Sequence, residues 1–197
     1  MLVLASASPR RRDLLLQAGY RFQVHPAHIP EDPLAGEDPT AYVTRLAREK
    51  AEVVYRERTS STNLQELRLD GQPLAVLGAD TTVTLDNAIL GKPQDAADAA
   101  RMLRLLSGRT HRVITGVALV TAQGAQVAAE VTAVRFLTLS DAEIAAYVAT
   151  GEPMDKAGAY AIQGRAARWI PRVEGCYFNV MGLPLALVCS LVESCAC

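Results

Sequence analysis

The stretch Val76-Leu-Gly-Ala-Asp-Thr-Thr-Val-Thr-Leu-Asp-Asn-Ala-Ile-Leu-Gly-Lys-Pro93 decides the fold. Its apolar parts are rich in β-branched and small residues, which favours strands, whereas Asp86-Asn87 is typical of a turn. The sequence therefore predicts a strand that ends near Leu85, a hairpin at Asp86-Asn87 and a returning strand over 88–90.

One carboxylate, that of Asp80, interrupts the apolar run of the first strand. An ionised carboxylate in such a run loses its hydration unless a cation, a metal or a cleft receives it. The hairpin would bring Lys92 back opposite Thr81 or Thr82, so that a carboxylate and an ammonium would line one pocket. The alternative is a strand-end aspartate paired with a nearby lysine, and the hairpin alone does not decide between the two.

The composition describes a packed globular protein. The chain has 197 residues, of which 50% are hydrophobic and 21% are charged. We expect a single α/β domain over residues 1–197, with a flexible tail from about residue 190. The net charge of −1 provides no general attraction for a nucleic acid polymer, so an anionic ligand would need a local cluster of cations.

Targeting and metal motifs give mostly negative results. Arg10-Arg11-Arg12 is followed only by Leu14-Leu-Leu16, which is too short for a signal peptide or a membrane span. We therefore expect a cytoplasmic protein without membrane contact. The four cysteines match no zinc spacing, and the three histidines form no His-Glu-x-x-His helix, which disfavours a zinc hydrolase.

A helix is predicted to begin at Ser8-Pro9, because serine is a good N-cap and proline fits the first helical position. Arg10 and Arg11 then stand in its first turn, where the helix dipole disfavours cations. This conflict is removed if an anion binds there, since backbone N–H groups and guanidinium groups can both hold phosphate oxygens. The alternative is a solvated basic turn, but we favour a phosphate site.

A second helix is predicted over about 40–58, with Asp38 as its cap. Its apolar stripe contains Lys50, which should point inward or toward a cleft, unless it only extends along the edge of the core. The proline-rich segment before this helix carries Glu31 and Asp32, which by themselves are ordinary loop residues.

The rest of the chain alternates between strand and helix signals. The predicted elements are a long loop over 59–73, a helix capped by Asp95, a hairpin over 112–137, a helix begun by the capping box Ser140-x-x-Glu143, a binding loop or flexible connection over 151–164, strand character over 166–184, and a final helix from about residue 183.

Several short motifs resemble, in sequence order, those of the Maf family of nucleoside triphosphate pyrophosphatases. They are Ser6-x-Ser8-Pro-Arg-Arg11, Ala47-Arg-Glu-Lys-Ala51, Gly78-Ala-Asp-Thr81, Leu90-Gly-Lys-Pro93, Thr115-Gly116, Asp155-Lys-Ala-Gly-Ala-Tyr-x-Ile-Gln-Gly164 and Gly182-Leu-Pro184. Each motif is weak alone, but together they cover nearly the whole chain.

The resemblance implies a fold like that of the inosine triphosphate pyrophosphatases. This is an elongated, twisted mixed sheet flanked by helices, with two lobes around a nucleotide cleft, as a homodimer. It also implies a house-cleaning hydrolase that cleaves dTTP and UTP to the monophosphate and pyrophosphate, with Mg²⁺ or Mn²⁺ as a cofactor.

The resemblance further implies the roles of individual residues. Asp80 would be the proton acceptor, and the residues around the phosphates and the metal would be Ser8, Arg10, Arg11, Glu31, Lys50 and Lys92. Of these, the metal would be held by Asp80 and Glu31. Thr81 and Gln163 match positions that mark the members acting on dTTP and UTP.

Two other functions remain open at this point. The chain could be a nucleotide-sensing regulator of cell division that does not catalyse, or a general phosphatase that releases orthophosphate. Retention of Asp80, Lys50 and Lys92 argues for turnover, because a sensor could bind phosphates with arginines alone. Product analysis separates the pyrophosphatase from the phosphatase.

Overall fold

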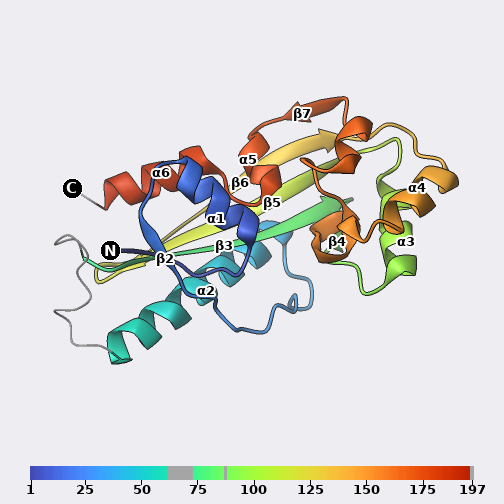
Figure 1. Ribbon diagram of the computed structural model, residues 1–197. Helices are drawn as coiled ribbons and strands as arrows, with labels where there is room; N and C mark the ends of the chain where they lie inside the picture. Colours follow the sequence, from blue (N-terminus) through green and yellow to red (C-terminus); the bar gives the residue numbers. More distant parts are fainter. Residues whose placement is uncertain (62–72, 87, 196–197) are drawn as a thin grey trace. The chain divides into compact units, whose positions relative to one another are not determined.

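The computed structural model describes residues 1–61, 73–86 and 88–195, and its strands join in one seven-stranded mixed sheet (Figure 1). The strand order is β2-β1-β3-β5-β6-β7, with β4 paired to β3. The strands are β1 (Leu2–Leu4), β2 (Phe22–Val24), β3 (Ala75–Leu85), β4 (Ala88–Leu90), β5 (Thr110–Thr121), β6 (Gly124–Arg135) and β7 (Arg172–Glu174). The α/β prediction is confirmed.

The helices account for most of the remaining described residues. The α-helices are α1 (Pro9–Gln17), α2 (Pro39–Ser61), α3 (Ala96–Leu106), α4 (Asp141–Val148), α5 (Tyr177–Met181) and α6 (Leu185–Ser194). Three short 3₁₀ helices are η1 (Glu152–Asp155), η2 (Ala157–Ala159) and η3 (Arg165–Trp169).

The chain divides into two compact units. The first consists of Met1–Asp80, Thr115–Glu130 and Gly182–Cys197, and the second of Thr81–Ile114 and Val131–Met181. The expectation of one domain over residues 1–197 stays a prediction.

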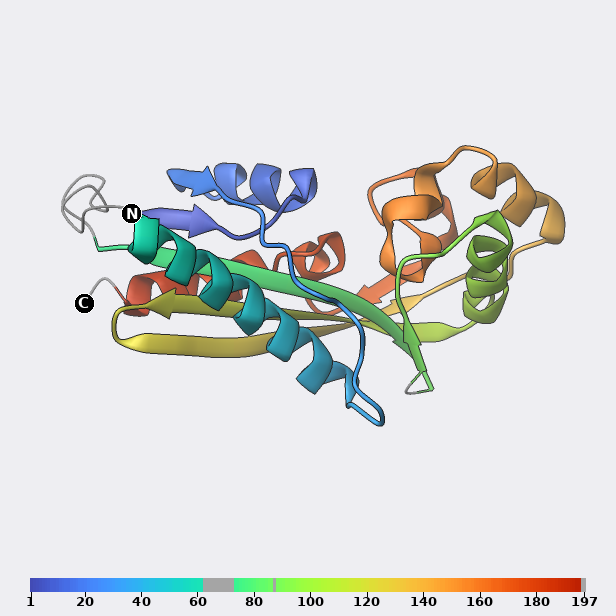
Figure 2. The ribbon, with the colours of Figure 1, turned by 90° about the horizontal axis from the view of Figure 1, so that it is seen from below.

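In the first unit, the short strand β1 lies between β2 and β3 and runs parallel to both. Helix α2 lies on one side of these strands, and α1 and α6 lie on the other (Figures 1 and 2). The buried residues of α2 pack with strand residues in one apolar cluster. Its members are Met1, Val3, Ala5, Ala47, Ala51, Val54, Leu74, Val76, Ala118 and Val120.

Two glycines let α2 lie directly against the strands. A Cβ atom on Gly78 would stand 2.1 Å from the carbonyl oxygen of Ala47, and one on Gly116 would stand 2.4 Å from that of Val43. Both obstacles are helix backbone, which cannot turn aside as a flexible side chain can. Any larger residue at either strand position would therefore displace the helix.

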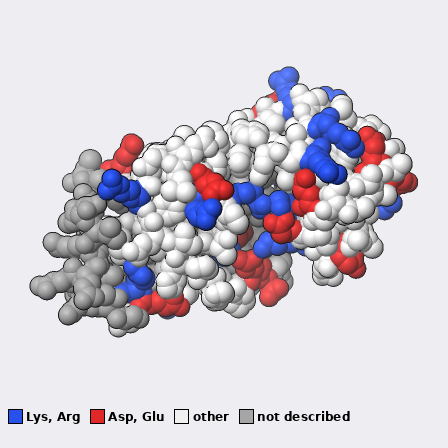
Figure 3. Space-filling view, viewed as in Figure 1, with Lys and Arg blue, Asp and Glu red and all other residues white. Residues whose placement is uncertain are grey.

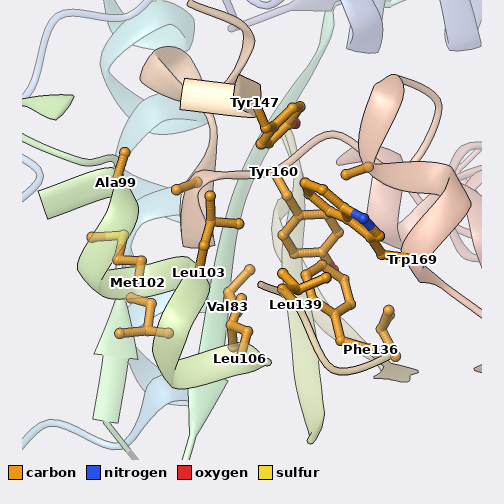
Figure 4. Packing of buried hydrophobic residues seen from close by; sticks show 14 of the residues in the cluster. Val83, Ala99, Met102, Leu103, Leu106, Phe136, Leu139, Tyr147, Tyr160 and Trp169 are labelled. Atoms are coloured by element: carbon orange, nitrogen blue, oxygen red, sulfur yellow. The ribbon is translucent and has the colours of Figure 1, made fainter. Parts of the chain in front are cut away.

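In the second unit, β3 and β4 form the predicted hairpin, with Val83 opposite Leu90 and Leu85 opposite Ala88. A second apolar cluster gathers around aromatic rings and the predicted core face of α3 (Figure 4). Labelled members are Val83, Ala99, Met102, Leu103, Leu106, Phe136, Leu139, Tyr147, Tyr160 and Trp169. The caps that the sequence predicted at Asp95 and at Ser140 with Glu143 are confirmed.

Three predicted segments have other bounds or another secondary structure than expected. Strand character was expected over 166–184, but Arg165–Trp169 is the 3₁₀ helix η3 and Tyr177–Met181 is helix α5, so those parts of the prediction are wrong. Residues 190–194, assigned to a flexible tail, belong to α6. The loop predicted over 59–73 begins later, because α2 continues to Ser61, and its residues 62–72 lie outside the described part of the chain.

The charges agree with a nearly neutral chain. On the face shown in Figure 3, acidic and basic side chains lie side by side, and no single sign covers that face. None of the helices among the described residues is long and apolar enough to cross a membrane.

Candidate functional site

The first unit brings three of the predicted residues into direct contact around Lys50. Asp38 caps α2 by accepting hydrogen bonds from Thr40 N and Ala41 N, which sets the rotation of the helix. The buried stripe of α2 then includes Lys50, which is only 6% exposed, between neighbours such as Ala47 and Ala51. The expectation of an inward lysine is confirmed.

The ammonium of Lys50 contacts two carboxylates. Its Nζ lies 2.6 Å from Oδ1 of Asp80 and 2.5 Å from Oε1 of Glu31. The side chain of Asp80 is 11% exposed and that of Glu31 is 46% exposed, so one acid lies in the interior and the other faces solvent. The result is a cation held between an inner and an outer carboxylate.

This contact answers the question that Asp80 raised in the sequence. A desolvated carboxylate was expected to need a cation, and the residue considered for that place was Lys92. The structure shows that Lys50 is such a cation, from a helix 30 residues earlier in the chain, while the role of Lys92 stays a prediction. A pairing within the hairpin was the obvious choice from sequence, since helix-to-strand contacts are not visible there.

Tyr42 fixes the position of Glu31, and the sequence analysis missed it. Its hydroxyl donates a hydrogen bond of 2.7 Å to the backbone carbonyl of Glu31. Burial raises the pKa of Tyr42 to about 12, and the charges of Asp80 and Glu31 act in the same direction. Tyr42 stands eight residues before Lys50, about 80° away around the helix axis, so the helical period alone does not identify it.

Arg45 of α2 also holds the segment that carries Glu31. Arg45 Nε lies 2.7 Å from Oε1 of Glu37, and Arg45 Nη2 donates to the backbone carbonyl of Asp32 at 3.2 Å. The hydrogen bond from Arg45 lowers the pKa of Glu37 to about 2. Glu37 also accepts from Leu34 N at 2.9 Å. The segment that carries Glu31 is therefore tied to α2 at several points.

The N-terminus of α1 is built as predicted. Ser8 is the N-cap and accepts from the backbone N–H of Arg11, and no acidic residue stands in the first turn. Ser6, which was not singled out from sequence, accepts from Ser8 N at 3.2 Å and from Nη1 of Arg11 at 3.3 Å. Arg10 follows in the same turn and is partly exposed.

Arg11 has a structural contact as well as a place in this turn. Its Nε donates a hydrogen bond of 2.8 Å to the carbonyl of Gly182. Burial lowers the pKa of Arg11, while the negative charges of Asp80 and Glu31 oppose that effect. The guanidinium therefore lies within the electrostatic reach of both carboxylates.

The other three predicted residues belong to the second unit. Thr81 follows Asp80 on β3, and Lys92 is exposed beyond the end of the hairpin pairing, which closes at Val83 and Leu90. Gln163 is exposed in a turn directly after the buried Ile162. The structure thus groups six of the nine candidates in one unit and three in the other.

Metal-binding residues do not cluster in the way that a protein-only metal cage requires. Among the residues that the structure describes, no group of three or more histidine, cysteine, aspartate or glutamate side chains is arranged to hold a metal ion. The two carboxylates of Asp80 and Glu31 nevertheless converge on one positive charge, the ammonium of Lys50. Two carboxylate donors of this kind suit Mg²⁺ when substrate phosphates and water complete its coordination.

Comparison with known proteins identifies relatives over nearly the full length. The chain is 52% identical over 187 residues to a dTTP/UTP pyrophosphatase of Koribacter versatilis, covering 95% of this chain and 90% of that protein. It is 51% identical over 194 residues to a dTTP/UTP pyrophosphatase of Geobacter sulfurreducens, covering 98% and 93%.

Among solved structures, the Staphylococcus aureus Ham1 protein matches with a TM-score of 0.49 and 12% identity over 98% of each chain. The family model described as Maf-like protein matches residues 1–195. With that match and relatives at about half identity, the chain belongs to the Maf family.

Proposed function

We propose that this chain is a nucleoside triphosphate pyrophosphatase that hydrolyses dTTP and UTP to the monophosphate and pyrophosphate. The observation that carries the proposal is the buried contact of Lys50 with both Asp80 and Glu31, in a chain whose relatives are named dTTP/UTP pyrophosphatases. Its biological role would be the removal of unwanted nucleotides.

Within this proposal, Asp80 accepts a proton from the attacking water. A carboxylate can do so only where a solvent path reaches it, and the 11% exposure of the Asp80 side chain supports a nearly closed site with little bulk water. Lys50 contacts this carboxylate at 2.6 Å and so holds it in one position.

The phosphate chain is proposed to meet the cations and the helix terminus. The N-cap Ser8, with Arg10 and Arg11, provides backbone N–H groups and guanidinium groups that suit phosphate oxygens. Lys50 and Lys92 would offset the charge that the phosphates carry as the anhydride bond breaks. These assignments rest on chemistry and on family resemblance.

A divalent cation, Mg²⁺ or Mn²⁺, is proposed as the cofactor, with Asp80 and Glu31 as its protein ligands. When bound, such an ion polarises phosphate oxygens and neutralises part of their charge. The tether from Tyr42 to the Glu31 carbonyl, at 2.7 Å, supports a ligand role for Glu31, because it holds an otherwise solvent-facing acid in place.

The base is proposed to be read by Gln163, with Thr81 beside Asp80 contributing to the same preference. Uracil and thymine present an N–H donor next to a carbonyl acceptor, and one primary amide can meet both. Cytosine reverses the pattern, and purines are larger. We therefore expect UTP and dTTP to be hydrolysed well ahead of CTP, ATP and GTP.

The experiment that tests the function is a nucleotide panel with Mg²⁺ or Mn²⁺, scored separately for pyrophosphate, orthophosphate and monophosphate. We expect pyrophosphate from UTP and dTTP. Orthophosphate as the first product would identify a general phosphatase, and binding without any product would favour the nucleotide-sensing regulator. Gln163→Leu should reduce kcat/KM for UTP and dTTP by about tenfold to a hundredfold, because the base would leave polar groups unpaired.

Assembly and location are proposed from the family resemblance alone. We propose a homodimer in the cytoplasm, with neither nucleic acid polymers nor membranes as partners. Light scattering of the purified chain at several concentrations tests the dimer, since a constant monomer mass would contradict it.

A further inference from the structure

A hydrogen-bonded bridge spans the segment that carries Gln163. The hydroxyl of Tyr147 on α4 accepts from Ala161 N at 3.2 Å and donates to Oε1 of Glu152 at 2.8 Å. The carboxylate of Glu152 accepts from Arg165 N, at 3.0 Å to Oε1 and 3.3 Å to Oε2. The bridge thus binds the backbone two residues before Gln163 and two residues after it.

Apolar packing also holds the backbone around Gln163. Tyr160 and Ile162 are each 5% exposed, and Ala166 is fully buried. All three belong to the second apolar cluster, in which Figure 4 labels Tyr160. The ring of Tyr147 lies edge-on to Trp169, with centroids 5.1 Å apart. Gln163 is exposed, whereas Ile162 before it is buried and Gly164 after it is partly buried, so its amide faces solvent.

Glycine at position 164 makes room for the bridge. A Cβ atom there would stand 2.0 Å from Oε1 of Glu152 and 2.6 Å from its Cδ. The backbone beside Gln163 therefore lies directly on the carboxylate. A methyl group at this position would push the carboxylate away from the N–H of Arg165.

Burial keeps the hydroxyl of Tyr147 protonated. Desolvation raises the pKa of Tyr147, and its hydrogen bond to Glu152 raises it further. The hydroxyl therefore remains a donor to Glu152 across the physiological pH range, while its oxygen still accepts from Ala161 N. No proton transfer is needed for the bridge to hold.

We infer that Tyr147 and Glu152 are positioning residues that hold Gln163 for base recognition, an inference that rests on the proposed function. A backbone fixed on both sides loses little further freedom when the amide meets a base, so more of the hydrogen-bond energy becomes available for discrimination. Neither residue touches the nucleotide in this role. Both act through the backbone of residues 161–165.

The test uses two tyrosines of the same cluster as a matched pair. Tyr147→Phe removes the hydroxyl that binds the loop backbone, whereas Tyr160→Phe removes one that is hydrogen-bonded to the side chain of His111, at 2.8 Å to Nε2. For Tyr147→Phe we expect the ratio of kcat/KM between UTP and CTP to fall by about tenfold, mainly through a higher KM for UTP. For Tyr160→Phe we expect the ratio to stay within about a factor of two, although stability falls.

Glu152 provides an independent pair of variants. Glu152→Gln keeps an oxygen that can accept from both Tyr147 and Arg165 N, so it should retain most of the preference for UTP. Glu152→Ala removes both acceptors and should flatten the preference as Tyr147→Phe does. This pair decides the question if Tyr147→Phe does not fold, with thermal unfolding measured for every variant.

The possible outcomes distinguish the positioning role of Tyr147 and Glu152 from the proposed base recognition by Gln163. If wild-type protein shows no preference for UTP and dTTP, the base-reading proposal and this inference are both overturned. If wild type has the preference and Gln163→Leu removes it, yet Tyr147→Phe and Glu152→Ala keep it, only the positioning role is wrong. An equal loss of preference in Tyr160→Phe would also overturn it, because general loosening of the cluster would then be the cause.

Discussion

The two units hold their candidate residues by different chemistry. In the first unit, charged groups hold one another: Lys50 contacts two acids, and Arg45 pairs with Glu37. In the second unit, Gln163 projects from a segment fixed by the Tyr147 hydroxyl, the Glu152 carboxylate, backbone N–H groups and an apolar cluster. We therefore expect the proposed bond cleavage and the proposed base recognition to respond to different perturbations.

The largest effect on activity is expected from Asp80→Asn in the first unit. We expect hydrolysis to fall by about 10²- to 10⁴-fold, because an amide cannot accept the proton of water. The fold should survive, since the amide oxygen can still accept from Lys50. Pyrophosphate release and thermal unfolding measure the two effects.

Asp86→Asn is the matched control for that change. Asp86 is an exposed turn residue paired with Arg109 at 2.5 Å, so this substitution should leave turnover close to wild type. Near wild-type turnover by a folded Asp80→Asn protein would instead remove Asp80 from the chemistry.

Lys50→Met tests how strongly the first unit depends on its central cation. Removing Lys50 leaves the inner carboxylate of Asp80 without this partner, which typically costs about 3 to 5 kcal/mol of unfolding free energy. The double variant with Asp80→Asn should recover part of that loss, since a neutral amide no longer requires the cation. Urea unfolding measures all three, and a single variant as stable as wild type would contradict the central role of Lys50.

Acid should affect the two units over different pH ranges. Burial lowers the pKa of His111 to about 3, well below its usual 6.5, so its stabilising contribution is complete above pH 6.5 and is lost as the pH falls toward 3. The loss can reach about 1.4 kcal/mol per pH unit in that window. Glu37, with a pKa lowered from 4.5 to about 2, loses its contribution only below about pH 4.5.

The check is urea unfolding at pH 7 and pH 5 for wild type and His111→Phe. The phenyl ring can keep the edge-on contacts of His111 with Phe136 and Tyr160. The variant should lose less stability between the two pH values than wild type does. Equal losses would mean that His111 does not control the response.

The smallest expected effect separates two neighbouring arginines of the first unit. The helix dipole alone predicts that removing either one stabilises the protein slightly. The bond from Arg11 to the buried carbonyl of Gly182 reverses this for Arg11→Ala, which should lose about 1 kcal/mol. Arg10→Ala should be neutral or gain at most about 1 kcal/mol.

Both variants should bind a non-hydrolysable UTP analogue more weakly, which calorimetry and thermal unfolding without ligand can measure together. Normal binding by both would contradict the phosphate site at α1. A stability gain in Arg11→Ala would show that its bond to Gly182 contributes nothing.

Local signals in the sequence predicted much of the fold. Caps at Ser8, Asp38, Asp95 and Ser140 set helix starts, and the inward position of Lys50 followed from the period of one helix. Strand character was wrongly extended over 175–184, because Cys-Tyr-Phe and Val are also typical of strands, whereas the segment folds as α5.

The contacts within the candidate site were harder to predict. The partner of Asp80 comes from a helix 30 residues away, and the bonds from Tyr42 and Arg45 reach backbone carbonyls, which carry no side-chain signal in a sequence. The same holds for the bridge through Tyr147 and Glu152, to which the loop contributes the backbone N–H donors of Ala161 and Arg165. Residue types could be predicted, but not the backbone that they hold.

The close contact of α2 with Gly78 and Gly116 makes the chemistry depend on two residues that carry no functional group. Lys50 lies less than one helical turn beyond Ala47, whose carbonyl stands 2.1 Å from where a Gly78 side chain would begin. A single methyl group there would lift the helix and draw the ammonium away from Asp80. In kinetic assays such a substitution would resemble the loss of a catalytic group, although its cause would be steric. A shorter side chain on α2 could not compensate for it, because the obstacle is the backbone carbonyl of Ala47.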